Sequence, residues 1–406
     1  MNTAKIDFIP EGTVTSTEGF RAGGTYAGIK KNGEHSLDLG LLFSEKPCVS
    51  TALFTTSKIK SAPVVLCQEQ LKKGKAVAII VNSGCANAYT GKQGLADAEE
   101  MAAQAANAIG ADPEDVLVAS TGVTGQPLPM ELIRTAINHI ILSWDGGHEL
   151  ARAIMTTDTM PKETAVAIKL GESQFTIGGV AKGSGMIHPD LATMFCFLTT
   201  DAAVELDFLK LALRKATDAS FNMISIDGDT SPSDTVLIMA NGLAENKPIS
   251  QGSRLADIFQ QALDQVCIYL AKAIAGDGEG ATKLIEVTVN GATNIAEAKL
   301  AARTVVSSPL VKAAVHGADP NWGRIVAAIG RSGAEVIESK IDLRIGDVSL
   351  VKGGRPLPSS EQDAVRVLKQ SEVPISVQLN LGTASATAWG CDLSEEYVTI
   401  NSQYMT

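Results

Sequence analysis

The sequence predicts an α/β or α+β protein that is large enough for two or three domains. Apolar runs typical of buried strands alternate along the chain with stretches that show helical spacing. The 406 residues are 45% hydrophobic and 19% charged, which is typical of a globular protein with substantial cores. No fixed-period repeat or low-complexity tract in the sequence favours a different architecture.

The first half of the chain contains two predicted strands and a predicted helix. "AVAIIV" (Ala76–Val81) is a buried-strand pattern, and the "NSGCANAYTGKQG" after it is predicted as a loop. Leu95–Ile109 consists of strong helix formers, and Gly110 is the expected end of that helix. Val116–Ser120 is predicted as a strand that runs into "TGVTGQPLP".

The middle of the chain predicts two further strands and two helices. Phe175–Lys182 and Met194–Ala202 are predicted as strands on either side of a Gly/Ser/Pro stretch. Leu206–Phe221 carries apolar residues at helical spacing, and Leu255–Ala275 is predicted as a longer helix that ends at "GDGEG".

Alternation continues in the last third of the chain. Leu284–Val289 and Val373–Leu379 are predicted as strands, and Ile295–Val306 as a helix between them. Ser360–Asp363 fits a capping box, which would open a short helix before the second of these strands.

Charge and hydropathy argue against two classes of partner. The net charge of −11 makes a nucleic-acid role unexpected, because phosphate binding requires a basic face. No apolar run approaches the roughly 18 residues of a membrane span. The N-terminus lacks a basic start followed by an apolar core, so we expect neither a secretory signal nor a transit peptide.

Cysteine and histidine spacing does not predict a metal site. The six cysteines form no CxxC pair and are expected to be reduced core residues of a cytosolic protein. The five histidines have no ligand spacing, and the common phosphate-loop, nucleophile-elbow and HExxH motifs are absent from the sequence. The remaining candidate chemistry is that of a hydroxyl group.

Thr193 is the candidate nucleophile, because a threonine at a new N-terminus can use its own α-amine as base. Cleavage before it would need a small preceding residue, a flexible approach and a following strand. Ala192, the "GSGMIHPD" stretch and "MFCFLTT" meet these three needs. The competing interpretation is an ordinary junction between a loop and a strand.

A second stretch offers donors for an oxyanion. "STGVTG" (Ser120–Gly125) follows a predicted strand, so its backbone N–H groups would point out of the end of the sheet. The competing interpretation is a plain glycine turn.

Several motifs together resemble the ornithine acetyltransferase family, the glutamate N-acetyltransferases of arginine biosynthesis. They are "KGSGMIHPDLATMFCFLTTDA", "ASTGVTGQPLP", "IMTTDTMPK", "DGDTSPSDT", "GDGEGATK", "GADPNWGR" and the terminal "NSQYMT". These motifs extend from about residue 20 to the last residue. The resemblance implies a layered α/β fold of the self-cleaving N-terminal-nucleophile type, with a smaller C-terminal α/β part from about 284 to 390.

The resemblance also implies how the chain is processed. Cleavage between Ala192 and Thr193 would give an α chain of residues 1–192 and a β chain of residues 193–406. Thr193 would be the nucleophile, and Thr121 and Gly122 would form the oxyanion hole.

The substrate contacts implied by the resemblance are Thr156, Lys182, Thr193, Glu279, Asn401 and Thr406. Within "MTTDT", the choice of Thr156 over Thr157 and Thr159 stays open. Lys182 can pair with a substrate carboxylate and Glu279 with an ammonium. Without the resemblance, both side chains would be read as solvated surface charges.

The implied reaction is a double displacement that moves an acetyl group from N-acetylornithine to glutamate through acetyl-Thr193. It releases ornithine and N-acetylglutamate and needs no metal or organic cofactor. Acetyl-CoA is a second acetyl donor in some family members, and no residue here decides its use. The resemblance further implies a cytoplasmic α2β2 assembly, without nucleic-acid or membrane partners.

Two other functions are compatible with the residues alone. A self-processing aminopeptidase or amidase with an N-terminal nucleophile would pass the acyl group to water instead of an amine. A non-catalytic binding protein would keep an intact chain of 42.4 kDa.

Overall fold

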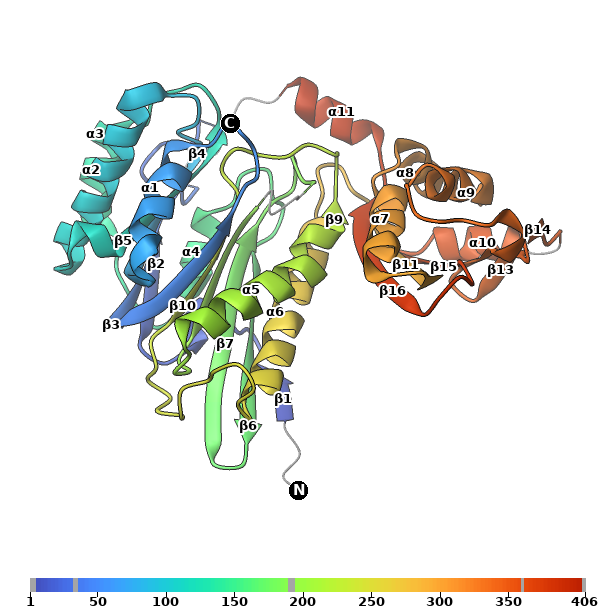
Figure 1. Ribbon diagram of the computed structural model, residues 1–406. Helices are drawn as coiled ribbons and strands as arrows, with labels where there is room; N and C mark the ends of the chain where they lie inside the picture. Colours follow the sequence, from blue (N-terminus) through green and yellow to red (C-terminus); the bar gives the residue numbers. More distant parts are fainter. Residues whose placement is uncertain (1–4, 32–35, 189–193, 359–360, 404–406) are drawn as a thin grey trace.

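A computed structural model describes residues 5–31, 36–188, 194–358 and 361–403 (Figure 1). Nine strands of this part form one mixed sheet in the order β1-β6-β7-β8-β10-β3-β4-β5, with β2 paired to β3. Their bounds are β1 (Lys5–Phe8), β2 (Phe20–Thr25), β3 (Leu39–Phe54), β4 (Lys75–Cys85), β5 (Val116–Val123), β6 (Lys162–Leu170), β7 (Ser173–Lys182), β8 (Phe195–Thr200) and β10 (Thr235–Ala240).

The end of β4 differs from the sequence prediction. Residues 82–85 were expected in a loop, but they continue the strand and pair in parallel with residues 120–123 of β5. Asn82 and Ser83 are both fully buried. Their polar side chains suggested a loop, whereas the neighbouring strand satisfies their backbone and tertiary packing overrides the local preference.

Helices α1 (Ala62–Gln70), α2 (Gly91–Ile109), α3 (Met130–Ala136) and α4 (Gly147–Ala153) belong to the part of the molecule built on β2–β5 (Figure 1). Gly110 ends α2 in the left-handed conformation, as predicted, while α2 begins at Gly91 and not at Leu95. A buried apolar cluster joins these helices to β3, β4 and β5 and includes side chains of β7, β8 and β10.

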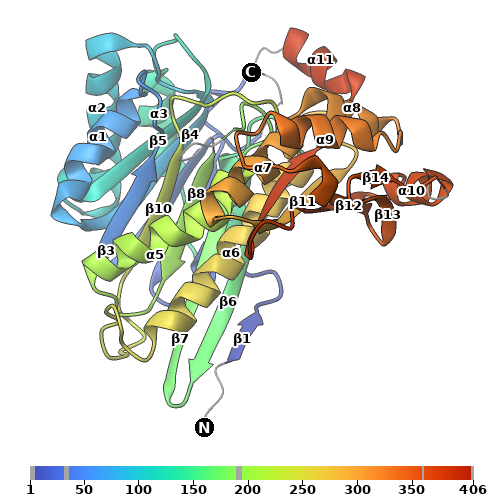
Figure 2. The same cartoon turned by 45° about the vertical axis from the view of Figure 1, so that its right-hand side comes forward.

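Helices α5 (Leu206–Ala219) and α6 (Ala256–Gly276) confirm two predicted helices and lie side by side across the first sheet (Figure 2). Helix α6 packs on β6 and β7 and also contacts strands of the second sheet. One continuous buried cluster therefore runs from the first sheet through α6 into the second sheet.

The second sheet has seven strands in the order β14-β13-β12-β15-β11-β16-β9. Their bounds are β9 (Ile224–Ser225), β11 (Leu284–Ala292), β12 (Asp342–Ile345), β13 (Val348–Lys352), β14 (Arg355–Pro356), β15 (Glu372–Gln378) and β16 (Ala384–Cys391). All but β9 come from residues 284–391. The predicted strands at Leu284 and Val373 correspond to β11 and β15.

The helices of the C-terminal part are α7 (Ile295–Val306), α8 (Pro309–His316), α9 (Trp322–Gly330), α10 (Glu361–Leu368) and α11 (Glu395–Ser402). Helix α7 has the predicted bounds and packs on β11 and β16, and the Asn294 side chain caps its start. Ser360, the expected first residue of the capping box, lies outside the described residues, and α10 starts at the next residue.

These observations confirm the α/β fold with helices layered on sheets and an α/β C-terminal part. All six cysteines are buried free thiols, as expected, and burial raises the pKa of Cys48 and of Cys67 to about 12. Among the described helices, none is long and apolar enough to cross a membrane.

The first sheet brings residues of two distant strand ends into contact at the site. The C-terminal ends of β5 and β7 are not neighbours in the sheet, yet Thr121 and Lys182 at these ends are in contact.

Candidate active site

A cavity of about 370 Å³ lies where these strand ends meet. Its walls include six of the residues predicted from the sequence, from five separate stretches of the chain: Thr121, Gly122, Thr156, Lys182, Glu279 and Asn401. Cavities of this size are typical of small-molecule sites. The structure therefore brings together residues that are up to 280 positions apart in the sequence.

Thr121 and Gly122 lie at the end of β5, paired with Ser83 and Gly84 of β4. Gly122 has a φ of +123°, and an added Cβ would lie 2.4 Å from the carbonyl carbon of Gly84. Only glycine fits this position, because the backbone conformation and the close approach both exclude a side chain. Gly122 thus allows β5 to approach β4 closely at the point where it lines the cavity.

Lys182, the last residue of β7, lies in the cavity wall with only 8% of its surface exposed. Its Nζ donates to Thr121 Oγ1 at 3.3 Å. Because a hydroxyl that accepts this bond keeps its own proton, Thr121 can still donate to a third group. Burial lowers the pKa of Lys182, and the nearby charge of Asp158 opposes that shift.

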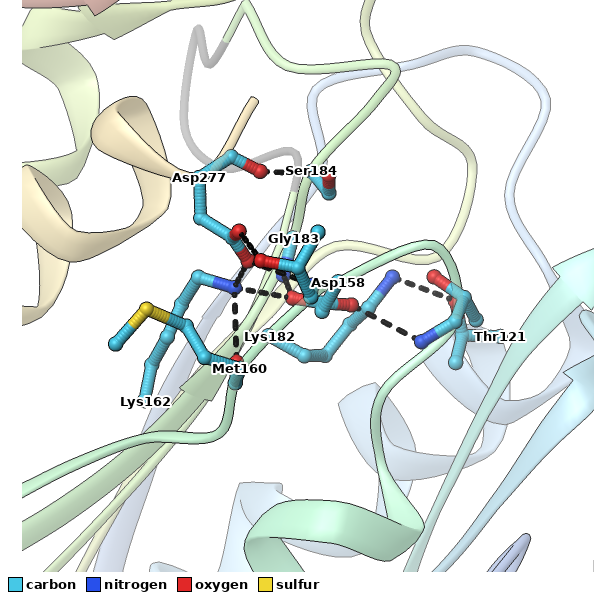
Figure 3. A network of polar contacts seen from close by, with 10 residues as sticks. Thr121, Asp158, Met160, Lys162, Lys182, Gly183, Ser184 and Asp277 are labelled. Carbon is cyan, nitrogen blue, oxygen red and sulfur yellow. Dashed lines mark hydrogen bonds and ion pairs between the residues drawn. The ribbon is translucent and has the colours of Figure 1, made fainter. Parts of the chain in front are cut away.

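A buried network of ion pairs, formed by Asp158, Lys162 and Asp277, lies next to Lys182 (Figure 3). Lys162 Nζ donates to Asp158 Oδ1 at 2.6 Å and to Asp277 Oδ2 at 2.5 Å, and all three side chains are almost completely buried. Asp158 Oδ1 also accepts the N–H of Gly183 at 2.7 Å. The network therefore ties the start of β6, the end of β7 and the end of α6 together.

The Asp158 carboxylate stays ionised in this network. Burial alone would raise its pKa, but the charges of Lys162 and Lys182 outweigh burial and hold the pKa well below its usual range. Asp158 thus places a fixed negative charge next to the two lysines.

Glu279 also lines the cavity and is 7% exposed. Its Oε2 accepts from Asn401 Nδ2 at 2.7 Å, which connects the C-terminal helix α11 to the site. Gly185 faces the same carboxylate, since a Cβ there would lie 2.4 Å from the Glu279 carboxyl carbon. The alternative reading of Lys182 and Glu279 as surface charges is therefore wrong: both are buried at one cavity.

The three threonines of "MTTDT" have different surroundings. Thr156 and Thr157 both line the cavity, so the structure leaves the choice between them open. Thr159 instead directs its hydroxyl to Asp277 Oδ1 and its N–H to Asp277 Oδ2 at 3.0 Å. Its hydroxyl is thus engaged in the ion-pair network.

Three predicted residues, Ala192, Thr193 and Thr406, lie outside the described residues. The chain is described again from Met194, which lines the cavity together with Phe195. The carbonyl of Met194 accepts the N–H of Thr235 at 3.0 Å, and Phe195 pairs with Lys182. The residue that follows Thr193 is therefore at the cavity wall.

Sequence reasoning missed several residues of the site. Ser231, Ser233 and Asp234 line the cavity, and the buried hydroxyl of Ser233 has no partner among the described residues. Their motif "DGDTSPSDT" was part of the resemblance, but no role was assigned to it. Lys162 and Asp277 could not be paired from the sequence, because 115 positions separate them.

The arrangement offers a buried cation, a buried carboxylate and hydroxyl groups in the lining of one cavity. Such a cavity can bind a molecule that carries both a carboxylate and an ammonium, and can stabilise an oxyanion. Within the described ranges, no cluster of three or more His, Cys, Asp or Glu side chains is arranged to hold a metal ion.

Comparison with known proteins shows the family to which the chain belongs. The family model of the ArgJ family matches residues 21–406. The arginine biosynthesis bifunctional protein ArgJ of Dehalococcoides mccartyi is 51% identical over 99% of this chain and 100% of its own length. The protein of that name from Symbiobacterium thermophilum is 52% identical over 97% of this chain and 99% of its own length.

A solved structure is also similar. The crystal structure of the arginine biosynthesis bifunctional protein from Bacillus halodurans is 47% identical, with a TM-score of 0.50. The match covers 52% of this chain and 98% of the solved chain. Since the family model covers nearly the whole sequence and the relatives match from end to end, the chain belongs to the ArgJ family.

Proposed function

We propose that this acyltransferase of arginine biosynthesis uses the cavity to transfer the acetyl group of N-acetylornithine to glutamate. The observation that supports this best is the position of Lys182 and Glu279, two buried opposite charges that face one cavity. N-Acetylornithine carries one carboxylate and one side-chain ammonium. Lys182 would bind the first and Glu279 the second, so that the acetyl group is directed toward the remaining donors.

Thr193 would be the nucleophile, after cleavage between Ala192 and Thr193 has freed its amine. Two observations support this: Met194 lines the cavity, and the solved Bacillus halodurans chain is about half as long as this one. Residues 193–406 are 214 residues, or about 53% of the sequence. A solved relative of this length is what cleavage at this position predicts.

In the first half-reaction, Thr193 Oγ attacks the acetyl carbonyl while its own amine takes the hydroxyl proton. The resulting oxyanion would accept hydrogen bonds from Thr121 and Gly122. The C–N bond then breaks, the proton passes to the leaving amine, and ornithine departs. In the second half-reaction, the amine of glutamate attacks the acetyl-threonine ester and N-acetylglutamate is formed.

No cofactor takes part in these steps, and acetyl-CoA would serve as a second donor through the same ester. Thr156, Asn401 and Thr406 would complete the substrate contacts. We also propose that the protein is cytoplasmic and forms the α2β2 assembly that the resemblance implies. A mass measurement of the native protein would test the assembly.

The deciding experiment incubates the purified protein with N-acetylornithine, with and without glutamate. The expected result is glutamate-dependent formation of ornithine and N-acetylglutamate in equal amounts. Release of free acetate at the same rate without glutamate would contradict the transfer and support the hydrolase. A parallel incubation of acetyl-CoA with glutamate tests the second donor.

A further inference from the structure

A carboxylate outside the cavity wall holds the segment that leads to the proposed cleavage position. Asp227 follows strand β9, and its Oδ2 accepts the N–H of Met186 at 2.6 Å while its Oδ1 accepts the N–H of Ile187 at 2.9 Å. Both bonds are charge-assisted and therefore stronger than bonds to a neutral acceptor. One side chain thus fixes two successive backbone groups.

The backbone that it fixes is strained. Met186 has a φ of +55°, in the left-handed region that residues with a side chain avoid. Met186 also leaves 48% of its surface exposed, so packing of its side chain does not explain this conformation. Strain of this kind persists only where surrounding contacts enforce it, and the two bonds to Asp227 are such contacts.

Further contacts anchor both ends of the stretch that contains the proposed cleavage bond. At one end, Ile187 accepts the N–H of Ile226 at 2.7 Å, and the carbonyl of His188 accepts the hydroxyl of Thr230 at 3.0 Å. At the other end, Met194 is bound to Thr235. The described residues on both sides of this stretch are therefore held by hydrogen bonds.

Asp227 also lies near the C-terminal helix. Burial, together with the negative charge of Asp227, raises the pKa of Tyr397 in α11 to about 12.

We infer that Asp227 is a positioning residue for self-cleavage, which holds the strained turn at Met186 so that Thr193 can reach the carbonyl of Ala192. This inference rests on the proposed function. In the cleavage step, the bond between Thr193 Oγ and the Ala192 carbonyl carbon forms and the peptide C–N bond breaks. The hydroxyl proton passes to the nitrogen, which becomes the free amine, and water then hydrolyses the ester to release the Ala192 carboxylate.

The test compares the full-length wild type with Asp227→Asn, which keeps the size of the side chain but can accept only one of the two backbone bonds. Cleavage is followed over time by intact mass, and acetyl transfer is measured per cut molecule. Asp227→Asn is expected to slow cleavage about tenfold, the effect of losing one charged hydrogen bond, with turnover per cut molecule within about twofold of wild type. Asp229→Asn is the matched control, because this exposed carboxylate two residues away binds neither Met186 nor Ile187 and should leave cleavage unchanged.

A rescue experiment separates positioning from a general loss of structure. Glycine adopts a positive φ without strain, so Asp227→Asn combined with Met186→Gly should recover most of the cleavage rate. If Asp227→Asn aggregates, Asp227→Glu is used in its place. Glutamate keeps the negative charge but displaces the carboxylate from Met186 and Ile187. Slow cleavage, and its rescue by Met186→Gly, are expected for this variant too.

The possible outcomes separate the inference from the proposed function. Wild-type protein that is never cut before Thr193 would overturn both. Wild type that is cut while Asp227→Asn is cut equally fast would overturn only the role of Asp227. A parallel fall in cleavage and in turnover per cut molecule, without rescue by Met186→Gly, would also overturn it, since that result indicates a structural role.

Discussion

Lys182 Nζ lies 3.3 Å from Thr121 Oγ1, although the two residues end strands that are not neighbours in the sheet. This contact places Lys182, the cation proposed to bind the substrate carboxylate, next to Thr121, a proposed donor to the oxyanion. In the proposed reaction, the charge of Lys182 would therefore act on two steps: it would attract the substrate carboxylate, and it would polarise the hydroxyl that donates to the oxyanion.

The first prediction concerns the nucleophile. Thr193→Ala should yield an uncut and inactive chain of 42.4 kDa, because it removes the hydroxyl needed for cleavage and for acetyl transfer. Intact mass and ornithine release are the measurements. Thr193→Ser keeps a hydroxyl and is the control, which should still be cut. Cleavage or turnover that survives in Thr193→Ala would refute the assignment.

The second prediction concerns pH. Because burial lowers the pKa of Lys182, its cation is lost at a lower pH than that of an ordinary lysine. Binding of a carboxylate is present below that pKa and is lost as pH rises through it. The KM for N-acetylornithine should therefore rise in alkaline solution below pH 10.5, the ordinary lysine value.

Lys182→Arg provides the control for this pH effect. A guanidinium stays charged throughout, so the variant should have a higher KM near neutral pH, from poorer fit, but little further rise with pH. An unchanged alkaline rise in Lys182→Arg would assign the effect to another group. Lys182→Met should lower kcat/KM about 100-fold, the effect of losing a charged hydrogen bond of about 3 kcal/mol.

The third prediction concerns stability. Lys162→Met leaves the carboxylates of Asp158 and Asp277 buried without their shared cation, and loss of one partner of a buried ion pair costs about 3–5 kcal/mol. The free energy of unfolding in urea is the measurement. Lys72→Met breaks an exposed pair with Glu69 and should leave the unfolding midpoint unchanged. Equal effects of the two changes would contradict the role of the network.

The same network predicts how stability depends on pH. The folded-state pKa of Asp158 is depressed, so the stabilisation it gives is present above the unfolded-state pKa, about 3.9, and is lost as pH falls below it. In Asp158→Asn the loss of stability in acid should be smaller than in the wild type. Unfolding midpoints measured from pH 7 down to pH 3 would show this.

The fourth prediction concerns Gly185. Gly185→Ala would place a Cβ 2.4–2.5 Å from the carboxyl group of Glu279 and should displace that carboxylate, which raises the KM for N-acetylornithine at least about tenfold. Gly330→Ala is the control, because a Cβ at that helical position meets no atom within 4 Å. Wild-type kinetics in Gly185→Ala would argue against a role for Glu279 in binding.

The local elements of the fold could be predicted because local chemistry determines them. Helix α7 has the predicted bounds, since helix formers fill Ile295–Val306 and Asn294 caps its start. The end of β4 could not be predicted, because Asn82 and Ser83 resemble loop residues until their pairing with β5 is known. Strand pairing depends on segments that are far apart in the sequence, and a local pattern of residues carries no information about which segments will pair.

The candidate site, like the fold, could be predicted from the sequence only in part. The sequence motifs identified Thr121, Gly122, Lys182 and Glu279, and these residues line one cavity. The burial of Lys182 and Glu279 did not follow from the sequence, because the residues that cover a charged side chain come from other segments. The pairing of Lys162 with Asp277 had no sequence signal either, since any of the many carboxylates could have been its partner.

The order of the strands has a consequence for the maturation of the enzyme. Strands β8 and β10, which follow Thr193, lie between β7 and β3, which precede it. Neither half of the chain can complete the first sheet without strands of the other. If the chain is cut before Thr193, as proposed, the single polypeptide would therefore have to fold before scission. Two separately translated halves would each expose unpaired strand edges and would be prone to aggregate before they met.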